Sequence, residues 1–590
     1  MFITILGLLL ILIPFLTIFC FKEKKYGFLY ISAFLICFHL ILALVTQSLH
    51  IFNYSLIISA NLILAIICVY LFLRYKKPIS KITINWLAII AFSIIFFELW
   101  SVHYNYTGPV SSINGETYTR HQVFKYPYFS DEWVGVSLTK YSINTHSLPN
   151  INPMNQSSFV NPMVAHFSLL AELFLILGLD PLIGFPIFSL VTGFLICLLI
   201  YFLLRINSVR NFLAIIITLG IPFIVNGSSL PGIWYLLPFI TSLIALLLSL
   251  IAFSTKNMFG FITSFIAFLL YPPMAVFIAP VILFYLMTGE NKKYYTIKNL
   301  LIIFALGIIF SLIIVTLNFS SGNFTQTFEV IKSFILRTNI DDGVPNLAPW
   351  LIIPYYLIFL IPFGIYQTMI KKKYFLLTPF MIGVIFWMTY TFTQKVFIID
   401  HYRITTITSI LTTIIAGFGL EYLYDIYKNK FKIFNNKILK IIAATSIFLY
   451  CFIISFSYTQ RLDWMDITLK TNSSNLQSKL SPLAPATEFL TAEDIKIFQN
   501  IQTKRFIAPQ WKALTIAAAT DNFPTETKAS TMTVNIISYN DFTNMNCVAQ
   551  SNILNKNLVN YMYIRRTDCP NYHKIGQSQE GLLLYEYKNE

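Results

Sequence analysis

Long hydrophobic runs recur through most of this 590-residue chain, in which only 11% of residues are charged. A run of about 20 apolar residues is long enough to cross the hydrocarbon core of a bilayer as a helix. The sequence holds about fourteen such runs. They are predicted to begin near Phe2, Gly27, Ser55, Ile82, Pro181, Asn211, Ile233, Met258, Met274, Leu300, Leu351, Phe375, Ile404 and Ile441. The pattern predicts an α-helical polytopic membrane protein.

Basic residues gather in alternate loops between these runs. They lie within residues 22–25, 74–81, 205–210, 256, 292–298, 371–373 and 428–440. Cytoplasmic loops of membrane proteins carry an excess of Lys and Arg, which also accounts for the net charge of +15 without a nucleic-acid partner. These loops are therefore predicted to be cytoplasmic. The parts predicted to lie outside are the N-terminus, the loop that holds Asp131, the Asn318 to Pro349 loop, the turn from Lys395 to Arg403 and everything after Tyr458.

Two hydrophobic runs need separate treatment. The first run lacks a basic start and a small-residue cleavage site, so we predict that it stays in the chain as a helix rather than being removed as a signal peptide. The run from Met163 to Leu179 is apolar enough to span, but a span there would move the 371–373 loop to the outside. We predict instead that this run forms a helix that lies in the membrane interface or dips into the membrane.

Three parts follow from this topology. Residues 1–81 are predicted to be extra N-terminal transmembrane helices, and residues 82–458 a transmembrane core with a long outer loop, 102–180, and a second outer loop, 318–350. Residues 459–590 are predicted to form a soluble exocytoplasmic domain.

The polar C-terminal part mixes helix and strand patterns. Strands are predicted over 514–519, 533–537, 559–564 and 581–587, and a helix over 493–502, which favours an α/β or α+β domain. Cys547 and Cys569 lie in this part and could pair if it faces an oxidising compartment.

An adjacent carboxylate pair, Asp131 and Glu132, lies in the first long outer loop and follows the aromatic residues Tyr126, Tyr128 and Phe129. Ionised side chains beside apolar surroundings are costly in a membrane protein, so the pair is a candidate catalytic site. A carboxylate here could take a proton from an acceptor hydroxyl, because an apolar setting raises carboxylate basicity. In the alternative interpretation, the preceding serine caps a helix and both carboxylates stabilise the helix dipole.

The outer turn before the run at Ile404 holds Lys395, His401 and Arg403, although outer loops carry few basic residues. A lipid phosphate at the membrane surface would account for them, since arginine binds phosphate oxygens in bidentate geometry. The alternative is a surface pair between Asp400 and Arg403 or an anchor in the membrane interface.

Further candidates lie in other outer segments. Arg337 with Asp341 and Asp342 is a candidate donor-binding or metal-binding element, and an ordinary Asp-Asp-Gly turn is the alternative. The candidates for substrate binding are Trp133, His166 and Glu172 together with these two aspartates, although a satisfied polar helix edge would also explain His166 and Glu172. No Walker loop, dinucleotide fingerprint or Cys/His zinc spacing occurs in the sequence, so no nucleotide cofactor is expected, and a divalent cation stays open.

Three short motifs together resemble the GT-C superfamily of membrane glycosyltransferases, which use polyprenyl-phosphate sugars. The motifs are Asp131-Glu132, the Asn161-Pro162-Met163 that opens the interfacial helix, and residues 509–514 (Pro-Gln-Trp-Lys-Ala-Leu) of the outer domain. The resemblance covers Ile82 to Glu590.

The resemblance implies that Asp131, with Glu132, is the catalytic base or orients the acceptor, and that Arg403 holds the lipid phosphate. The sequence departs from the family pattern in its three extra N-terminal helices and in Asn161-Pro162-Met163, which replaces a His-Pro-Pro motif. No second acidic motif is evident either.

The favoured function is transfer of a sugar, with inversion, from a polyprenyl-phosphate donor to a glycan, lipid or protein acceptor at the outer face of the cytoplasmic membrane. The alternatives are a polysaccharide polymerase or ligase of another fold, and a lipid-linked sugar flippase or other transporter. A transporter is expected to hold polar residues inside several spans. In this sequence, the ionisable residues that come nearest to the middle of a predicted span are His39 and Glu98.

Overall fold

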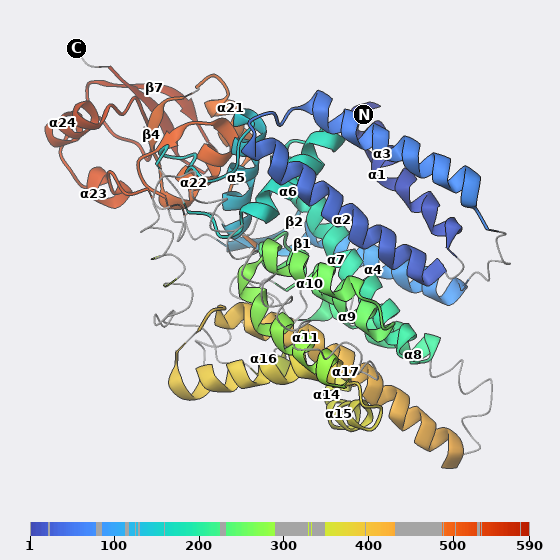
Figure 1. Ribbon diagram of the computed structural model, residues 1–590. Coiled ribbons are helices and arrows are strands. Elements are labelled where there is room, and N and C mark those ends of the chain that lie inside the picture. Colours follow the sequence, from blue (N-terminus) through green and yellow to red (C-terminus); the bar gives the residue numbers. More distant parts are fainter. Residues whose placement is uncertain are drawn as a thin grey trace.

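The computed structural model describes residues 2–21, 24–77, 85–104, 106–111, 117–123, 125–127, 130–157, 160–224, 232–288, 329, 332, 348–395, 397–430, 486–487, 489–501, 503–527, 532, 534–578 and 580–588. Figure 1 shows a large helical body and a small C-terminal domain at one end of it. The described helical elements of the body are α1 (Phe2–Leu12), η1 (Ile13–Cys20), α2 (Lys24–Ser48), α3 (Tyr54–Tyr75), α4 (Trp86–Tyr104), α5 (Ser130–Thr145), α6 (Val164–Leu177), α7 (Pro181–Ile206), α8 (Asn211–Leu219), η2 (Ile221–Phe223), α9 (Pro238–Ser254), α10 (Phe259–Leu270), η3 (Pro272–Met274), α11 (Ala275–Thr288), η5 (Pro349–Leu351), α14 (Tyr355–Ile358), α15 (Ile361–Ile370), α16 (Tyr374–Thr393) and α17 (His401–Lys430).

Six described helices are long and apolar enough to cross a membrane. They cover Ile3–Cys20, Gly27–Ser48, Tyr54–Tyr75, Pro181–Ile206, Tyr374–Thr393 and His401–Lys428. Most of the other predicted runs form shorter apolar helices, and the run near Asn211 forms α8, which is only nine residues long. The runs predicted near Leu300 and Ile441 lie outside the described residues. The described part thus supports a polytopic helical protein but not the count of about fourteen spans.

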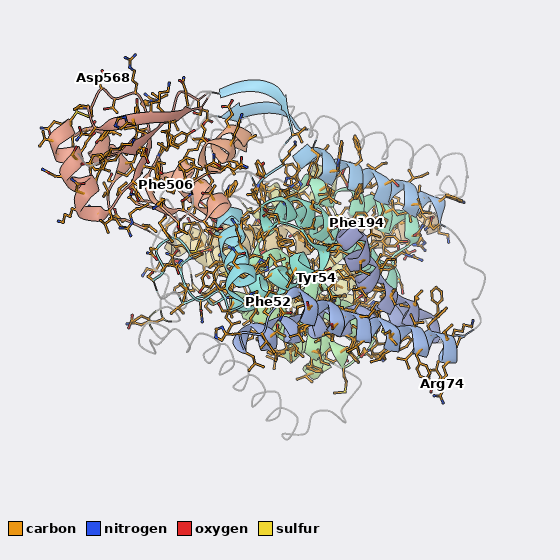
Figure 2. All side chains as sticks on the ribbon, turned by 90° about the horizontal axis from the view of Figure 1, so that it is seen from above. Phe52, Tyr54, Arg74, Phe194, Phe506 and Asp568 are labelled. Carbon is orange, nitrogen blue, oxygen red and sulfur yellow. A yellow bond between two sulfur atoms is a disulfide. The ribbon has the colours of Figure 1, made fainter. Side chains whose placement is uncertain are left out.

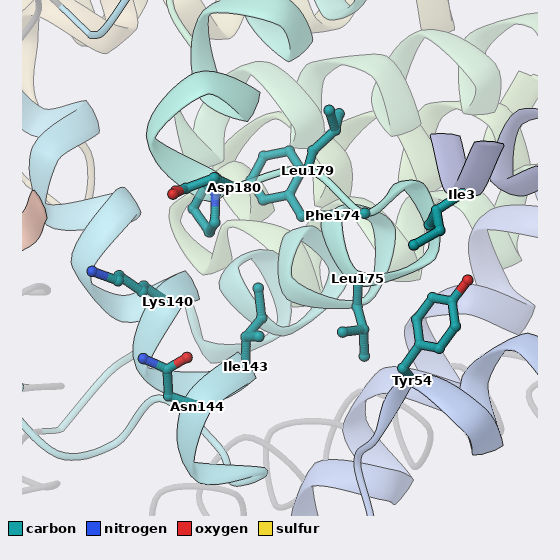
Figure 3. A pocket seen from close by; sticks show the side chains of 11 residues that line it. Ile3, Tyr54, Lys140, Ile143, Asn144, Phe174, Leu175, Leu179 and Asp180 are labelled. Atoms are coloured by element: carbon teal, nitrogen blue, oxygen red, sulfur yellow. The ribbon is translucent and has the colours of Figure 1, made fainter. Parts of the chain in front are cut away.

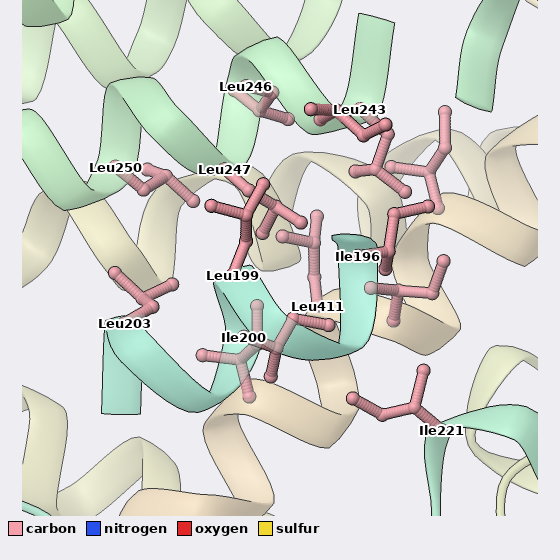
Figure 4. Packing of buried hydrophobic residues seen from close by; sticks show 14 of the residues in the cluster. Ile196, Leu199, Ile200, Leu203, Ile221, Leu243, Leu246, Leu247, Leu250 and Leu411 are labelled. Carbon is pink, nitrogen blue, oxygen red and sulfur yellow. The ribbon is translucent and has the colours of Figure 1, made fainter. Parts of the chain in front are cut away.

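Helix α17 is the most buried of the six candidate spans. In its most apolar window 94% of the residues are buried, against 22–33% in the three N-terminal spans. Leu411 of α17 packs in one cluster with Leu199 of α7 and Leu247 of α9 (Figure 4). A Cβ on Gly364 of α15 would lie 2.0 Å from the carbonyl oxygen of Ile415, so α15 and α17 touch through their backbones. The N-terminal spans are peripheral by comparison.

Basic residues from loops predicted to share one side of the membrane meet at one end of the body. Arg210, just before α8, binds Glu421 of α17, and its Nη2 lies 2.6 Å from Asp425 Oδ1. Lys373 donates a hydrogen bond of 2.6 Å to Asn207 Oδ1. Arg74, in the last turn of α3, lies at the far end of the molecule from the C-terminal domain (Figure 2). The charge pattern therefore agrees with the spatial grouping of these loops.

Helix α6 corresponds to the run predicted to lie in the membrane interface. Twelve of its 14 residues are buried. Helices α1, α2 and α3 pack against it, and α5 and α7 pack against it as well. A helix lying in the interface would expose one polar face, whereas the extra N-terminal helices cover α6. Helix α6 is therefore enclosed by other helices of the body, and its predicted place in the membrane interface, or dipping into the membrane, stays a prediction.

The C-terminal domain is built on a five-stranded mixed sheet with strand order β5-β4-β6-β8-β7. Strands β5, β4 and β6 are parallel, while β8 is antiparallel to both β6 and β7. Its described elements are α21 (Ala492–Phe498), β4 (Arg505–Ile507), α22 (Gln510–Thr520), β5 (Phe523–Pro524), α23 (Tyr539–Thr543), α24 (Cys547–Asn557), β6 (Tyr561–Ile564), β7 (Tyr572–Gln577) and β8 (Leu583–Tyr587). A disulfide joins Cys547 and Cys569.

The sequence predicted part of this domain correctly. The predicted helix over 493–502 and the strands over 559–564 and 581–587 correspond to α21, β6 and β8. The strand predicted over 514–519 is wrong, because these residues lie in α22, where three consecutive alanines favour helix. The strand predicted over 533–537 is not formed either, and the described part of that segment makes a single isolated bridge between Asn535 and Glu526.

The first outer loop is attached to the C-terminal domain at two places. Its hairpin, β1 (Tyr106–Ser111) with β2 (Thr117–Gln122), pairs through β1 with β3 (Ala486–Thr487), which precedes the domain. Helix α5 packs against α22. Lys140 of α5 reaches Asp521 at 3.1 Å and donates to the Ala519 carbonyl at 3.0 Å. The loop that carries Asp131 and the C-terminal domain therefore form one continuous structure.

Candidate functional site

Asp131 and Arg403 approach each other from segments far apart in the sequence. Asp131 lies in the first turn of α5, and Arg403 lies in the first turn of α17. Arg403 Nη2 is 3.6 Å from Asp131 Oδ2. The Asp131 side chain is 52% exposed, whereas that of Arg403 is 19% exposed. An accessible carboxylate thus lies beside a largely buried guanidinium.

Arg403 is fixed along one edge of its guanidinium. Nη1 donates to Asp400 Oδ2 at 2.5 Å and to the Tyr271 hydroxyl at 3.2 Å. The guanidinium carbon also lies 5.6 Å from the centre of the Tyr271 ring. The 3.6 Å contact with Asp131 is an ion pair beyond hydrogen-bond range. Within the described part, Nη2 therefore keeps donors that a ligand could use.

Glu132 has a different environment from Asp131, although the two residues are adjacent. Its side chain is buried, and Oε1 accepts hydrogen bonds from the Ser189 hydroxyl of α7 at 2.9 Å and from the Leu236 N–H at 2.8 Å. Consecutive residues of an α-helix point about 100° apart, so one carboxylate faces the site and the other faces the core. Glu132 anchors the first turn of α5 to α7 and to the chain that enters α9.

Glu132→Gln is expected to retain most of the activity, because glutamine keeps the side-chain oxygen that accepts from Ser189 and Leu236. Weakening a charge-assisted hydrogen bond to a neutral one costs about 1 kcal/mol, so the loss of turnover should stay below about tenfold. Steady-state kinetics on the folded variant measure this. A much larger loss would assign Glu132 itself to the chemistry.

The other basic residues of the outer turn differ in accessibility. Lys395 is exposed, and its backbone N–H donates to Thr393 Oγ1 at 3.2 Å. His401 is 3% exposed and stacks on Tyr390 with 3.7 Å between ring centres. Neither ring nitrogen of His401 has a hydrogen-bond partner within the described part. Of the residues predicted to bind phosphate, Arg403 and Lys395 are thus reachable, His401 lies in the interior, and Arg337 is outside the described residues.

The residues predicted to bind substrate are mostly internal. Trp133 is fully buried in the apolar cluster that joins α5, α6 and the C-terminal domain. His166 Nδ1 lies 2.9 Å from the Thr241 hydroxyl, and Glu172 Oε1 lies 2.9 Å from His39 Nδ1. These three side chains contact other parts of the protein and present no accessible face. Asp341 and Asp342 lie outside the described residues.

The motif that begins at Pro509 is also part of a folded core. It opens α22, and Lys512 is completely buried between Asp494 at 2.6 Å and Glu580 at 2.7 Å. Tyr563 donates to the second oxygen of Asp494 at 2.6 Å. The lysine of the motif therefore holds the C-terminal domain together rather than facing Asp131.

A separate cavity of about 370 Å³ lies along the second half of α5 (Figure 3). Its α5 residues are Lys140, Ile143 and Asn144, which follow Asp131 by more than two helical turns. Its other walls come from the end of α6 and the turn that leads into α7, with Ile3 of α1 and Tyr54 of α3 on the far side. The cavity therefore lies where α5 and α6 meet the N-terminal helices. Neither Asp131 nor Arg403 lines it.

The charge of Asp180 affects Tyr126, which precedes α5 in the chain. Burial raises the pKa of the Tyr126 hydroxyl, and the charge of Asp180 raises it further, so this phenol stays protonated at neutral pH. Tyr128 and Phe129, two further aromatic residues named in the sequence, lie outside the described residues, as does the side chain of the proposed helix cap. Among the residues that the structure describes, no group of three or more His, Cys, Asp or Glu side chains is arranged to hold a metal ion.

Two contacts at the site were not predicted from the sequence. The hydroxyl of Tyr271, which precedes Pro272 and Pro273, accepts a hydrogen bond from Arg403. The burial of Glu132 against Ser189 was not foreseen. The Asp400–Arg403 pair, considered as an alternative for the outer turn, is present. No local signal identifies the first two, because each joins residues from different helices.

No protein-family profile and no curated protein sequence matches the chain. Among solved structures, it is similar to an oligosaccharyltransferase of Archaeoglobus fulgidus in the apo form, with 14% identity, a TM-score of 0.45, and coverage of 85% of this chain and 74% of that one. It is also similar to the archaeal oligosaccharyltransferase AglB from Archaeoglobus fulgidus in complex with an inhibitory peptide and a dolichol-phosphate, with 14% identity, a TM-score of 0.42, and coverage of 81% and 69%. Both of these solved structures are oligosaccharyltransferases.

Proposed function

We propose that this protein is an integral-membrane glycosyltransferase that moves a sugar from a polyprenyl-phosphate donor to a hydroxyl of a glycan, lipid or protein acceptor at the outer face of the cytoplasmic membrane. The observation that carries the proposal is the contact between the accessible carboxylate of Asp131 and the anchored guanidinium of Arg403. A proton acceptor and a phosphate-binding cation are the two groups that such a transfer needs side by side.

In the proposed reaction, Asp131 accepts the proton of the acceptor group as that group attacks the anomeric carbon of the sugar. A bond forms between the acceptor atom and the anomeric carbon, and the bond from that carbon to the phosphate oxygen breaks. The electron pair leaves with the lipid phosphate. A single displacement inverts the configuration at the anomeric carbon.

Arg403 is proposed to bind the leaving phosphate through Nη2. Its Nη1 edge is held by Asp400 and Tyr271, so the guanidinium cannot swing freely, and its exposed edge faces Asp131. A fixed positive charge near the leaving group stabilises the charge that develops in the transition state. Lys395, exposed in the same turn, is a second candidate for the phosphate.

The proposed orientation places the C-terminal domain outside the cell. The disulfide between Cys547 and Cys569 supports it, because stable disulfides belong to oxidising compartments. The grouping of basic loops at the opposite end supports it as well, because such loops face the cytoplasm. No nucleotide-sugar donor is then needed at the site, since the lipid carries the sugar across.

Cysteine labelling tests this orientation. In a variant whose five cysteines outside the disulfide (Cys20, Cys37, Cys68, Cys197 and Cys451) are replaced, a membrane-impermeant maleimide applied to intact cells should react at Asn144→Cys and at Lys556→Cys. It should not react at Lys372→Cys until the membrane is opened. All three positions are exposed. Labelling of Lys372→Cys in intact cells would reverse the topology and remove the outer-face enzyme proposal.

A further inference from the structure

A buried polar cluster joins the N-terminal helices to α6. Glu172 Oε1 of α6 lies 2.9 Å from His39 Nδ1 of α2 and 3.5 Å from Asn61 Nδ2 of α3. The Glu172 and Asn61 side chains are completely buried, and His39 is 5% exposed. One turn before Glu172 in α6, the backbone carbonyl of Ser168 accepts a hydrogen bond of 3.3 Å from the Gln47 side chain of α2.

This cluster lies inside helices that the sequence assigns to the membrane, where isolated charge is costly. An unpaired carboxylate in such a place costs several kcal/mol. The imidazole of His39, whose Nδ1 lies 2.9 Å from Glu172 Oε1, gives this carboxylate the partner that it needs. Within the described part, no other charged side chain of α1, α2, α3 or α6 reaches the pair, and His166 of α6 faces Thr241 instead.

Helix α6 also supports the helix that carries Asp131. A Cβ on Gly135 of α5 would lie 3.3 Å from the ring of Phe167 of α6 and 2.6 Å from that of Phe185 of α7. Gly135 follows Asp131 by four residues and so lies on the same face of α5. At the other end of α5, Ile143 packs against the cluster formed by Phe52, Ile57, Ala171 and Ile176.

These contacts form one continuous path from the N-terminal helices to the site. His39 and Asn61 hold Glu172, Glu172 fixes the rotation and height of α6, and Phe167 of α6 packs one turn from Asp131. Resting on the proposed function, we propose that Glu172, held by His39 and Asn61, is a positioning residue that sets the distance between Asp131 and Arg403. The extra N-terminal helices are then a supporting part of the site rather than a separate anchor.

The test compares His39→Leu with the double variant His39→Leu/Glu172→Gln in the full-length protein. His39→Leu leaves the carboxylate of Glu172 buried with only Asn61 beside it, so α6 is expected to shift. The second substitution removes the uncompensated charge while glutamine keeps an oxygen that accepts from Asn61. Ser168→Ala is the matched control, because the Ser168 hydroxyl is buried on the same face of α6 and has no hydrogen-bond partner in the described part.

The primary measurement does not depend on activity. With the free cysteines replaced, Asp131→Cys and Arg403→Cys are introduced into each background, and the rate of crosslinking by a short bismaleimide is recorded. We expect the rate to fall severalfold in His39→Leu, because α6 supports α5 through Phe167, and a displaced α5 moves the thiol at position 131 away from the thiol at position 403. It should recover in His39→Leu/Glu172→Gln and stay unchanged in Ser168→Ala.

Transferase kinetics on the same variants, with Asp131 and Arg403 intact, give the second measurement. The expected pattern is a fall in kcat for His39→Leu with little change in KM, and recovery in the double variant. Unchanged crosslinking in His39→Leu, or a loss that the double variant does not restore, would overturn the positioning role. Crosslinking as expected in a protein without transferase activity would instead count against the proposed function alone.

Discussion

Asp131→Asn is expected to abolish most sugar transfer while leaving the protein folded and inserted. The substitution keeps the size and shape of the side chain at an exposed position in the first turn of α5, so packing changes little. It removes the group that accepts the proton from the acceptor. General-base catalysis typically contributes about 10²- to 10⁴-fold, and the same loss of turnover is expected here. Turnover of donor and acceptor by purified protein in detergent or lipid measures it.

The matched comparison is Glu132→Gln, one residue along the same helix. Both variants replace a carboxylate with an amide, and both residues are in the first turn of α5, so an effect through the helix dipole should be similar in the two. Only the base hypothesis predicts a large difference between them. Near-parental turnover in a well-expressed Asp131→Asn variant would show that Asp131 merely stabilises the start of the helix.

The sequence predicted the large-scale plan because that plan depends on local composition. The length of a hydrophobic run and the bias of Lys and Arg are properties of short segments. The loops that this bias assigned to one side of the membrane also meet in space, because Lys373 binds Asn207 and Arg210 binds Glu421 near the end of α17. Spans interrupted by proline or glycine were harder to predict. Helix α8 ends at Gly220 after nine residues, although the apolar run around it is longer.

The site was predicted only in part, because its geometry depends on contacts between helices. Asp131 and Arg403 were both named from the sequence, yet nothing local indicated that they would lie 3.6 Å apart. Adjacent carboxylates looked equivalent in the sequence, and the helix separates them into one exposed and one buried group. Glu172 was predicted to face substrate, but α2 and α3, which were counted as additions to the core, cover it with His39 and Asn61.

Arg403→Ala is expected to weaken use of the lipid-phosphate donor more than use of the acceptor. The guanidinium is anchored by Asp400 and Tyr271, and its Nη2 lies 3.6 Å from the exposed carboxylate of Asp131, so we expect its loss to remove a contact to phosphate rather than to the sugar or the acceptor. A charge-assisted hydrogen bond contributes about 1.5–3 kcal/mol, which corresponds to a loss of roughly 10- to 100-fold in kcat/KM for the donor. Kinetics with the donor varied at saturating acceptor, and the reverse, measure the difference.

Two further variants separate phosphate binding from structural support. Arg403→Lys should recover only part of the loss, because lysine keeps the positive charge but cannot hold Asp400 and Tyr271 along one edge while presenting a second edge to phosphate. Tyr271→Phe removes one hydrogen bond that the charged guanidinium donates to a neutral hydroxyl, and Asp400 still holds Nη1, so its effect should stay below that of Arg403→Ala. If Arg403→Ala and Arg403→Lys both left donor kinetics unchanged, Arg403 would only fasten the start of α17. The phosphate would then have to bind elsewhere, with Lys395 and Arg337 as the next residues to replace.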